Sequence, residues 1–200
     1  MVPIRRFIAA FFAFLFAAGV LCSHAQVVPS ANRGKFSLTA GGLGSVFQPD
    51  YAGLGEPETS PQRLYGAGAF VDLKFTHWIQ IEAEGRWLRF NTFNGIDEDT
   101  YLAGPRLPIH RFRFFGATPY VKALAGYGRM TFENKHGWGR YTAVAYGGGV
   151  DFRVTKRISA RLPDFEYQQW PNWSEGTKKS YTLWPYGLSV GVSYRILGRP

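Results

Sequence analysis

Apolar and polar residues alternate along most of this chain from residue 34 onward, in eight separate stretches. The last stretch is the most regular, because Leu188, Val190 and Val192 share one parity while small or polar residues occupy the positions between them. Successive side chains of a strand point to opposite faces, so each stretch predicts a strand with one apolar and one small or polar face. The predicted strands cover residues 34–47, 64–76, 78–90, 101–110, 114–132, 141–154, 158–170 and 184–196.

The seventh stretch contains a change of parity. Ile158 and Leu162 share the outward parity, whereas Phe165 and Tyr167 belong to the other one. One extra residue at Leu162 or Pro163 restores a common face, and an inserted residue of this kind is a β-bulge. Proline is tolerated at a bulge because it has no N–H to lose from the ladder. We therefore predict a β-bulge at this point.

The connections between the stretches alternate in length. Polar segments follow the first, third, fifth and seventh stretches, and short turns follow the others. Transmembrane β-barrels of bacterial outer membranes have this asymmetry, with long external loops and short periplasmic turns. The polar segments cover residues 48–62, 91–99, 133–140 and 171–179. We predict an all-β fold, an eight-stranded antiparallel up-and-down transmembrane β-barrel with both termini on the periplasmic side.

Tryptophan positions agree with this orientation. Aromatic residues form girdles where the apolar band of a barrel meets the two membrane surfaces. Trp78 lies beside a short turn, and the other tryptophans lie at or beyond the strand ends that meet the long loops: Trp87, Trp138, Trp170, Trp173 and Trp184. The sequence therefore predicts an external girdle that contains these five residues.

Charged residues occur in mid-strand, on the parity opposite to the apolar residues. On the lipid face a basic residue would cost about 2 to 4 kcal/mol at the bilayer midplane, so we expect these side chains to point inward. An eight-stranded barrel is only wide enough for side chains, and opposite charges can pair across its lumen. The predicted lumen ion-pair network consists of Asp72, Lys74, Glu82, Glu84, Arg86, Arg106, Lys122, Asp151, Arg153, Arg161, Asp164 and Glu166. A lumen filled in this way would oppose continuous water-filled conduction.

The first 25 residues have the three parts of a secretory signal peptide. Two arginines precede an apolar run over residues 7–22, and Ser23 and Ala25 are the small residues of a peptidase site. The run is shorter than the roughly 20 residues that a membrane-spanning helix needs. We predict a signal peptide over residues 1–25 and an outer-membrane barrel domain over residues 26–200.

Basic residues outnumber acidic ones, 23 against 14. The predicted cleavage removes two arginines and no acid, so the mature chain carries a net charge of +7. This excess fits either a solvated basic surface or attraction to anionic lipid head groups and lipopolysaccharide phosphates. The sequence contains no nucleic-acid recognition motif, so we expect no nucleic-acid partner.

Several segments together resemble the small eight-stranded outer-membrane barrels of the OmpA-like family, over the transmembrane domain alone. They are residues 101–106, 119–120, 147–152 and 161–168. The last strand is also similar to the signal that the barrel assembly machinery reads, through Ser189, Gly191, Tyr194 and Ile196. The chain departs from that signal by ending on Leu197-Gly198-Arg199-Pro200 rather than on an aromatic residue. The resemblance implies a bacterial outer-membrane location after export.

Candidate catalytic and metal-binding groups are few. Some eight-stranded barrels deacylate lipid A with a histidine and a serine two residues on, but His77, His110 and His136 have Ile, Phe and Trp at that spacing. The acidic run 97–99 lacks the ligand spacing of a calcium loop and is interpreted as an exposed acidic loop. We therefore expect no catalytic, cofactor or metal site.

The function that these observations favour is that of a non-catalytic, monomeric outer-membrane barrel. It would contribute to envelope integrity and to surface interaction through four external loops. Its expected partners are outer-membrane lipid, lipopolysaccharide and the barrel assembly machinery. Two alternatives stay open: a lipid A-modifying enzyme with its site in the loops, and a narrow gated pore.

Overall fold

The structure is a computed structural model, and it describes residues 36–50, 63–76, 78–92, 95–110, 116–131, 137–173 and 181–198. The predicted signal peptide lies outside these residues, as do two of the three histidines named above, His77 and His136. Within the described part, no helix has the length and apolar character needed to cross a membrane.

Antiparallel strands make up almost all of the described chain. Their bounds are β1 Ser37–Gln48, β2 Leu64–Lys74, β3 Gln80–Phe90, β4 Glu98–Pro108, β5 Ala117–Thr131, β6 Trp138–Arg153, β7 Ile158–Trp173, β8 Tyr181–Leu183 and β9 Tyr186–Leu197. The eighth strand begins earlier than predicted, with β8, and is interrupted at Trp184 and Pro185 before β9, because a proline offers no N–H to the ladder. The chain continues in register beyond this break, where Gln168 N donates to Pro185 O at 2.8 Å.

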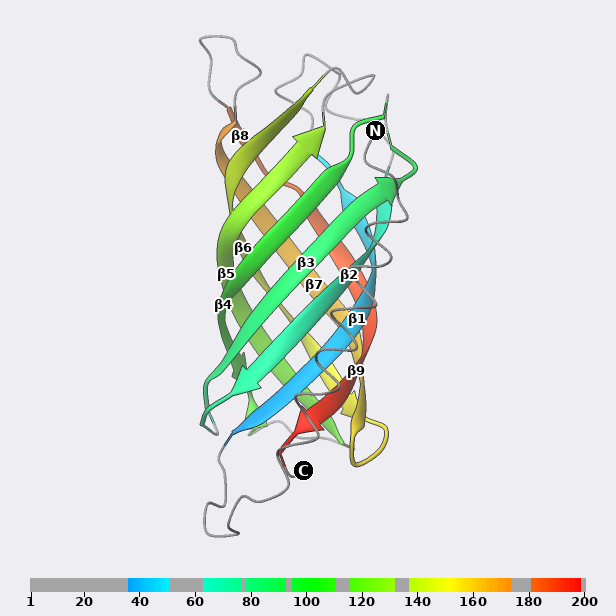
Figure 1. Ribbon diagram of the computed structural model, residues 1–200, viewed down its shortest axis with the longest axis vertical. Coiled ribbons are helices and arrows are strands. Elements are labelled where there is room, and N and C mark those ends of the chain that lie inside the picture. The colour runs from blue at the N-terminus through cyan, green and yellow to red at the C-terminus, as the bar shows by residue number, and fades with distance from the viewer. Residues whose placement is uncertain are drawn as a thin grey trace, which may run out of the picture. The chain divides into compact units, whose positions relative to one another are not determined.

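The strands form a closed barrel in which each strand pairs with its neighbours in sequence. β1 pairs with both β2 and β9, and β6 pairs with both β5 and β7, so that the wall has no free edge (Figure 1). Closure satisfies the backbone groups that a bilayer cannot solvate. Figure 1 also shows the strands tilted against the long axis, with β1 beside β9 where the wall closes. The predicted eight-stranded up-and-down barrel is confirmed, with β8 and β9 together as its eighth strand.

Strand parity separates an apolar outer face from the lumen, as the sequence predicts. On β9, Leu188, Val190 and Val192 are exposed on the outside, whereas Ser189 and Ser193 are buried. The β-bulge is confirmed as well: the residues between Arg161 and Asp164 are out of register with both neighbouring strands. Leu162 and Pro163 both lie on the outside, and inward alternation resumes at Asp164.

The two ends of the barrel differ in their connections. We call the end with connections 49–63, 91–97, 132–137 and 174–180 the loop end. The turn end carries connections 75–79, 109–116 and 154–157, together with the start of β1 and the end of β9.

The length asymmetry is weaker than predicted, because connection 109–116 is not short. β5 starts only after Gly116, whose φ of 81° is incompatible with an extended strand. The fourth polar loop also begins later than predicted, since β7 continues to Trp173.

Candidate functional site

The lumen is filled by side chains in two layers. Charged residues occupy the half near the turn end, and mainly apolar residues, with buried Glu98 among them, occupy the half near the loop end. The charged layer is built by inward positions of β2 to β7, and most of its side chains are almost completely buried.

Lys122 lies at the centre of the charged layer. Its Nζ contacts Glu82 Oε1 at 3.1 Å and Glu84 Oε2 at 2.9 Å, both on β3. On β7 it contacts Asp164 Oδ2 and Glu166 Oε2, each at 3.0 Å. One ammonium group on β5 therefore joins two strands that lie on opposite sides of the barrel.

Arg86 makes a second connection between β3 and β7. Its Nη1 donates to Glu166 Oε1 at 2.7 Å, and its Nη2 lies 3.1 Å from Glu84 Oε1. Glu166 Oε1 also accepts a hydrogen bond from Gln168 Nε2 at 2.6 Å, and Gln168 Oε1 accepts one from Trp170 Nε1 at 2.8 Å. This chain of hydrogen bonds links the charged layer to the apolar layer.

Two arginines complete the charged layer near the turn end. Arg161 donates to Glu82 and Asp72 at 2.8 Å each and lies 3.3 Å from Asp151. Arg106 contacts the same three carboxylates, and its hydrogen bond to Asp151 is the shortest of them. Each guanidinium also lies over an aromatic ring: Arg106 is 3.8 Å from the Tyr120 centroid, and Arg161 is 3.7 Å from that of Phe70.

Acids outnumber bases among the described residues of this cluster. The cations are Arg86, Arg106, Lys122 and Arg161, and the carboxylates are Asp72, Glu82, Glu84, Asp151, Asp164 and Glu166. Each cation therefore stabilises several carboxylates at once. Removal of one cation would leave buried negative charge without compensation, which is strongly unfavourable in a dry interior.

Two residues of the predicted network occupy the rim of the turn end. Arg153 is exposed at the turn end of β6, so its predicted burial is wrong, and Lys74 at the end of β2 is only half-buried. Both occupy the last positions of their strands, where inward parity points to the rim rather than to the packed lumen. The other ten predicted residues are brought together.

The apolar layer was missed by the sequence reasoning. It consists of inward residues near the loop end: Phe47, Leu64, Leu88, Ile96, Leu102, Leu124, Met130, Ala143, Ala145, Trp170 and Leu183. Trp170 is completely buried in it and does not join the external girdle, which corrects that prediction. Their inward parity is visible in the sequence, but apolar residues on that parity do not by themselves indicate a lumen layer.

The acidic run 97–99 also differs from its interpretation as an exposed loop. Glu98 and Asp99 lie in β4 and are buried. Asp99 accepts hydrogen bonds from Arg89 Nε at 3.1 Å and Nη2 at 2.7 Å. The ladder with β3 and β5 extends the strand through these residues, because Glu98 lies opposite both Leu88 and Met130.

The residues of the predicted assembly signal lie along β9, which closes the barrel against β1. Ser189 points inward and its hydroxyl lies 2.8 Å from that of Ser45 on β1, while Gly191 is also on the inward parity. Tyr194 and Ile196 are exposed on the outside. The remaining histidine, His110, lies two residues beyond the end of β4, at the turn end.

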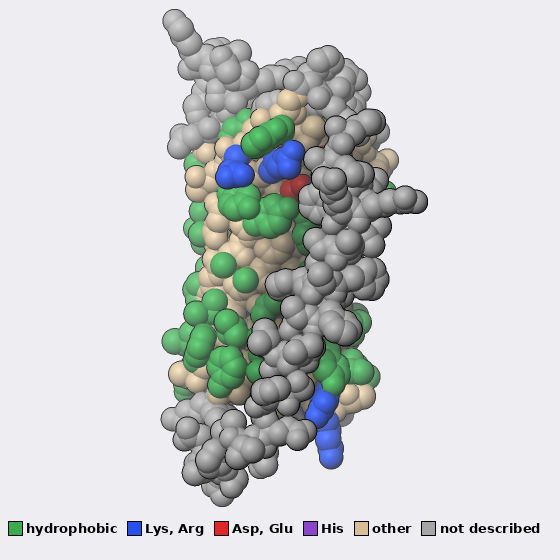
Figure 2. Space-filling view, in the orientation of Figure 1, with side chains coloured by type: hydrophobic (Ala, Val, Ile, Leu, Met, Phe, Trp, Pro, Cys, Tyr) green, Lys and Arg blue, Asp and Glu red, His purple; other side chains and the backbone are tan. Residues whose placement is uncertain are grey.

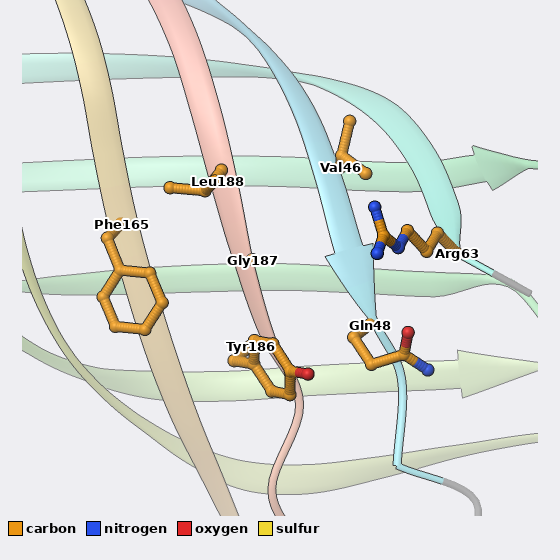
Figure 3. Close-up of a pocket in the computed structure, with 7 residues that line it drawn as sticks. All are labelled: Val46, Gln48, Arg63, Phe165, Tyr186, Gly187 and Leu188. Atoms are coloured by element: carbon orange, nitrogen blue, oxygen red, sulfur yellow. The ribbon is translucent and has the colours of Figure 1, made fainter. Parts of the chain in front are cut away.

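The outer wall carries a shallow hollow of about 210 Å³ near the loop end. It lies where β7, β9 and β1 are neighbours (Figure 3). Phe165, Tyr186, Leu188 and Val46 supply apolar lining, and the Arg63 side chain extends over β1 toward it (Figure 3). The hollow therefore faces outward from the barrel and is separate from the lumen.

Known proteins share this architecture. The crystal structure of Neisserial surface protein A has a TM-score of 0.54 and 11% sequence identity, over 80% of this chain and 96% of that one. The N-terminal β-barrel domain of Pseudomonas aeruginosa OprF has a TM-score of 0.50 and 14% identity, over 79% of this chain and 97% of that one. At such identities the similarity concerns the fold alone.

A comparison with curated proteins found no match. The family model of the outer membrane protein beta-barrel domain, however, matches residues 13–195, which is most of the chain. Together with the closed antiparallel wall and its apolar outer face, this match identifies the chain as a member of the outer membrane protein beta-barrel domain family.

Proposed function

We propose that this protein is a non-catalytic outer-membrane barrel that contributes to envelope integrity and to surface interaction at its loop end. The observation that carries the proposal is the double filling of the lumen. Ten charged side chains occupy one half and apolar side chains close the other. A lumen of this kind supports a role for the wall and the loops rather than for an internal conduit.

The proposal includes the orientation of the barrel, with the loop end outside the cell. The charged layer then lies on the periplasmic side, and the four connections of the loop end face the medium. A closed wall leaves no unpaired strand edge, which supports a monomer. We further propose that the assembly machinery reads Ser189, Gly191, Tyr194 and Ile196 on the strand that closes the barrel.

Two measurements test the proposal directly. Purified barrel reconstituted in planar bilayers should give no stepwise conductance, under conditions in which a porin conducts. The lipid A mass spectrum should be the same in cells with and without the protein, whereas deletion should increase sensitivity to bile salts or detergent. Conductance would favour the narrow pore, and an altered lipid A spectrum would favour the enzyme; either result contradicts the proposal.

A further inference from the structure

Two arginines stand directly opposite each other on the outer wall near the loop end. Arg129 on β5 pairs in register with Arg140 on β6, and both side chains are exposed. They share the parity of the outward residues Tyr127 and Tyr146. Side chains at directly opposed positions lie close together, so two like charges there are unfavourable unless something compensates them.

A neighbouring acid does not provide this compensation. Asp99 on β4 is the register partner of Arg129 on its other side. Both of its carboxylate oxygens, however, accept hydrogen bonds from Arg89. Among the described residues, no acid forms an ion pair with Arg129 or Arg140. We call Arg129 and Arg140 the arginine row; within the described part of the chain it carries two positive charges that no ion pair compensates.

Aromatic rings lie beside both guanidinium groups of the arginine row. Arg129 lies 4.8 Å from the ring centroid of Trp138, and Arg140 lies 4.9 Å from that of Tyr127. A guanidinium on an aromatic face keeps its N–H donors in its own plane, where they suit the oxygens of a phosphate. The stacking also reduces the conformational entropy that the side chains would lose on binding an anion.

The arginine row lies at the level of an aromatic band that crosses the same wall. Trp87 donates from Nε1 to Tyr101 Oη at 2.9 Å, and the Tyr101 and Tyr127 ring centroids are 5.2 Å apart. Such bands mark the head-group level of a membrane. Figure 2 shows two basic side chains and one acidic side chain close together near the upper end of the face drawn, with hydrophobic side chains above and below them.

We propose that Arg129 and Arg140 bind a phosphate group of lipopolysaccharide in the outer leaflet. The positive excess, the stacked guanidinium groups and the head-group level fit a phosphorylated lipid held against the wall. This inference rests on the proposed orientation, because only an external loop end meets the outer leaflet. It assigns one binding site to lipopolysaccharide, one of the partners expected from the sequence.

The test compares the folded wild-type barrel with the double variant Arg129→Gln/Arg140→Gln in detergent micelles. A control, Arg153→Gln/Lys156→Gln, removes two exposed basic residues at the turn end. Native mass spectrometry measures the binding of lipid A with two phosphates, of dephosphorylated lipid A and of phosphatidylglycerol. We expect the double variant to bind phosphorylated lipid A at least about tenfold more weakly, from the loss of two charge-assisted contacts.

The control should bind like the wild type, and dephosphorylated lipid A should not distinguish the three proteins. Equal affinities of the wild type and the double variant for phosphorylated lipid A would overturn the proposal. Equally tight binding of phosphatidylglycerol at the same arginines would overturn the assignment to lipopolysaccharide.

A second measurement, of the free energy of unfolding with and without phosphorylated lipid A, separates binding from a purely structural role. Because the two charges repel each other, Arg140→Gln alone should leave the lipid-free barrel as stable as the wild type or more so. The stabilisation that phosphorylated lipid A adds should nevertheless be smaller in this variant, and an unchanged lipid effect would contradict the proposal. Conductance of the wild type would contradict the proposed function without affecting this result, since the arginines lie on the outer wall.

Discussion

Arg161 reaches across the whole lumen to Glu82, with its Nη1 2.8 Å from Glu82 Oε2. Arg161 lies on β7 and Glu82 on β3, and three strands separate these two in either direction around the wall. Arg86 and Glu166 join the same two strands with the charges exchanged. The two contacts therefore fix the distance between opposite walls.

Replacement of Arg161 by methionine should destabilise the folded barrel strongly. The side chain keeps similar length, but Glu82 and Asp72 lose a buried cation, which costs about 3 to 5 kcal/mol. Urea titration, followed by the heat-modifiable gel shift of the folded band, measures the change. Arg153→Met is the matched control and should change stability by no more than about 0.5 kcal/mol, because Arg153 is exposed. Equal losses in both variants would contradict the role of the buried ion pairs.

The excess of carboxylates predicts unequal effects of two conservative substitutions. Glu166→Gln should cost about 3 kcal/mol, because Glu166 compensates Arg86 and Lys122 and accepts from Gln168. Glu84→Gln should cost less than about 1 kcal/mol, since it removes one of the surplus negative charges. Its Oε1 lies 3.1 Å from Arg86 Nη2 in an ion pair but accepts no hydrogen bond. The same urea titration compares them, and a larger loss for Glu84→Gln would refute this account of the charge balance.

The outer face of β9 predicts a penalty for charge at Val190. This side chain is 58% exposed on the outside of the barrel. Val190→Arg should make folding into bilayers less favourable by about 2 to 4 kcal/mol, because it places a cation in hydrocarbon. Val190→Leu controls for side-chain size and should fold like the wild type. If both variants fold equally well, Val190 does not face lipid.

Gly128 lies where the apolar layer leaves no room for a side chain, so a substitution there tests how tightly this layer is packed. A Cβ at this position would lie 2.5 Å from the Trp170 ring, whereas a Cβ at Gly44, on the outer wall, would meet nothing within 4 Å. Gly128→Ala should therefore destabilise the barrel by about 1 to 3 kcal/mol through overpacking. Gly44→Ala should be close to neutral in the same assay. A neutral Gly128→Ala would indicate that the Trp170 ring has room to move.

Orientation is tested by cysteine labelling on intact cells that express the variants Glu56→Cys, Lys178→Cys and Thr155→Cys. Glu56 and Lys178 lie in loop-end connections, outside the described residues, and Thr155 is exposed in the turn between β6 and β7. A membrane-impermeant maleimide should label the first two and reach Thr155→Cys only after lysis. The reverse pattern would invert the proposed topology.

The alternation of residues was sufficient to predict the strands, their inward and outward faces, and the bulge at Pro163. It succeeded because a strand has a period of two, so a change of parity is visible in the sequence itself. Strand ends were less accurate, as at Glu98 and at Trp173. There the ladder with neighbouring strands extends pairing into segments whose composition resembles a loop.

The charged site was predicted as a set of inward residues but not as a set of contacts. Parity cannot distinguish Arg153, which ends at the rim, from Arg161, which is 1% exposed. Their difference depends on height within the barrel, which is set by strand tilt and register. The same limitation hid the arginine row, since Arg129 and Arg140 become neighbours only through the pairing of β5 with β6.

The sequence by itself determined which face of each strand meets lipid, because each position has only two choices and the bilayer strongly disfavours charge. Only the tertiary structure decided which charges meet. Closure of the wall brings β3 and β7 to opposite sides of a narrow lumen, so that Glu82 and Arg161 pair although they are 79 positions apart in the sequence. It also separates the lumen into a charged half and an apolar half, since register assigns each inward side chain its level along the barrel axis.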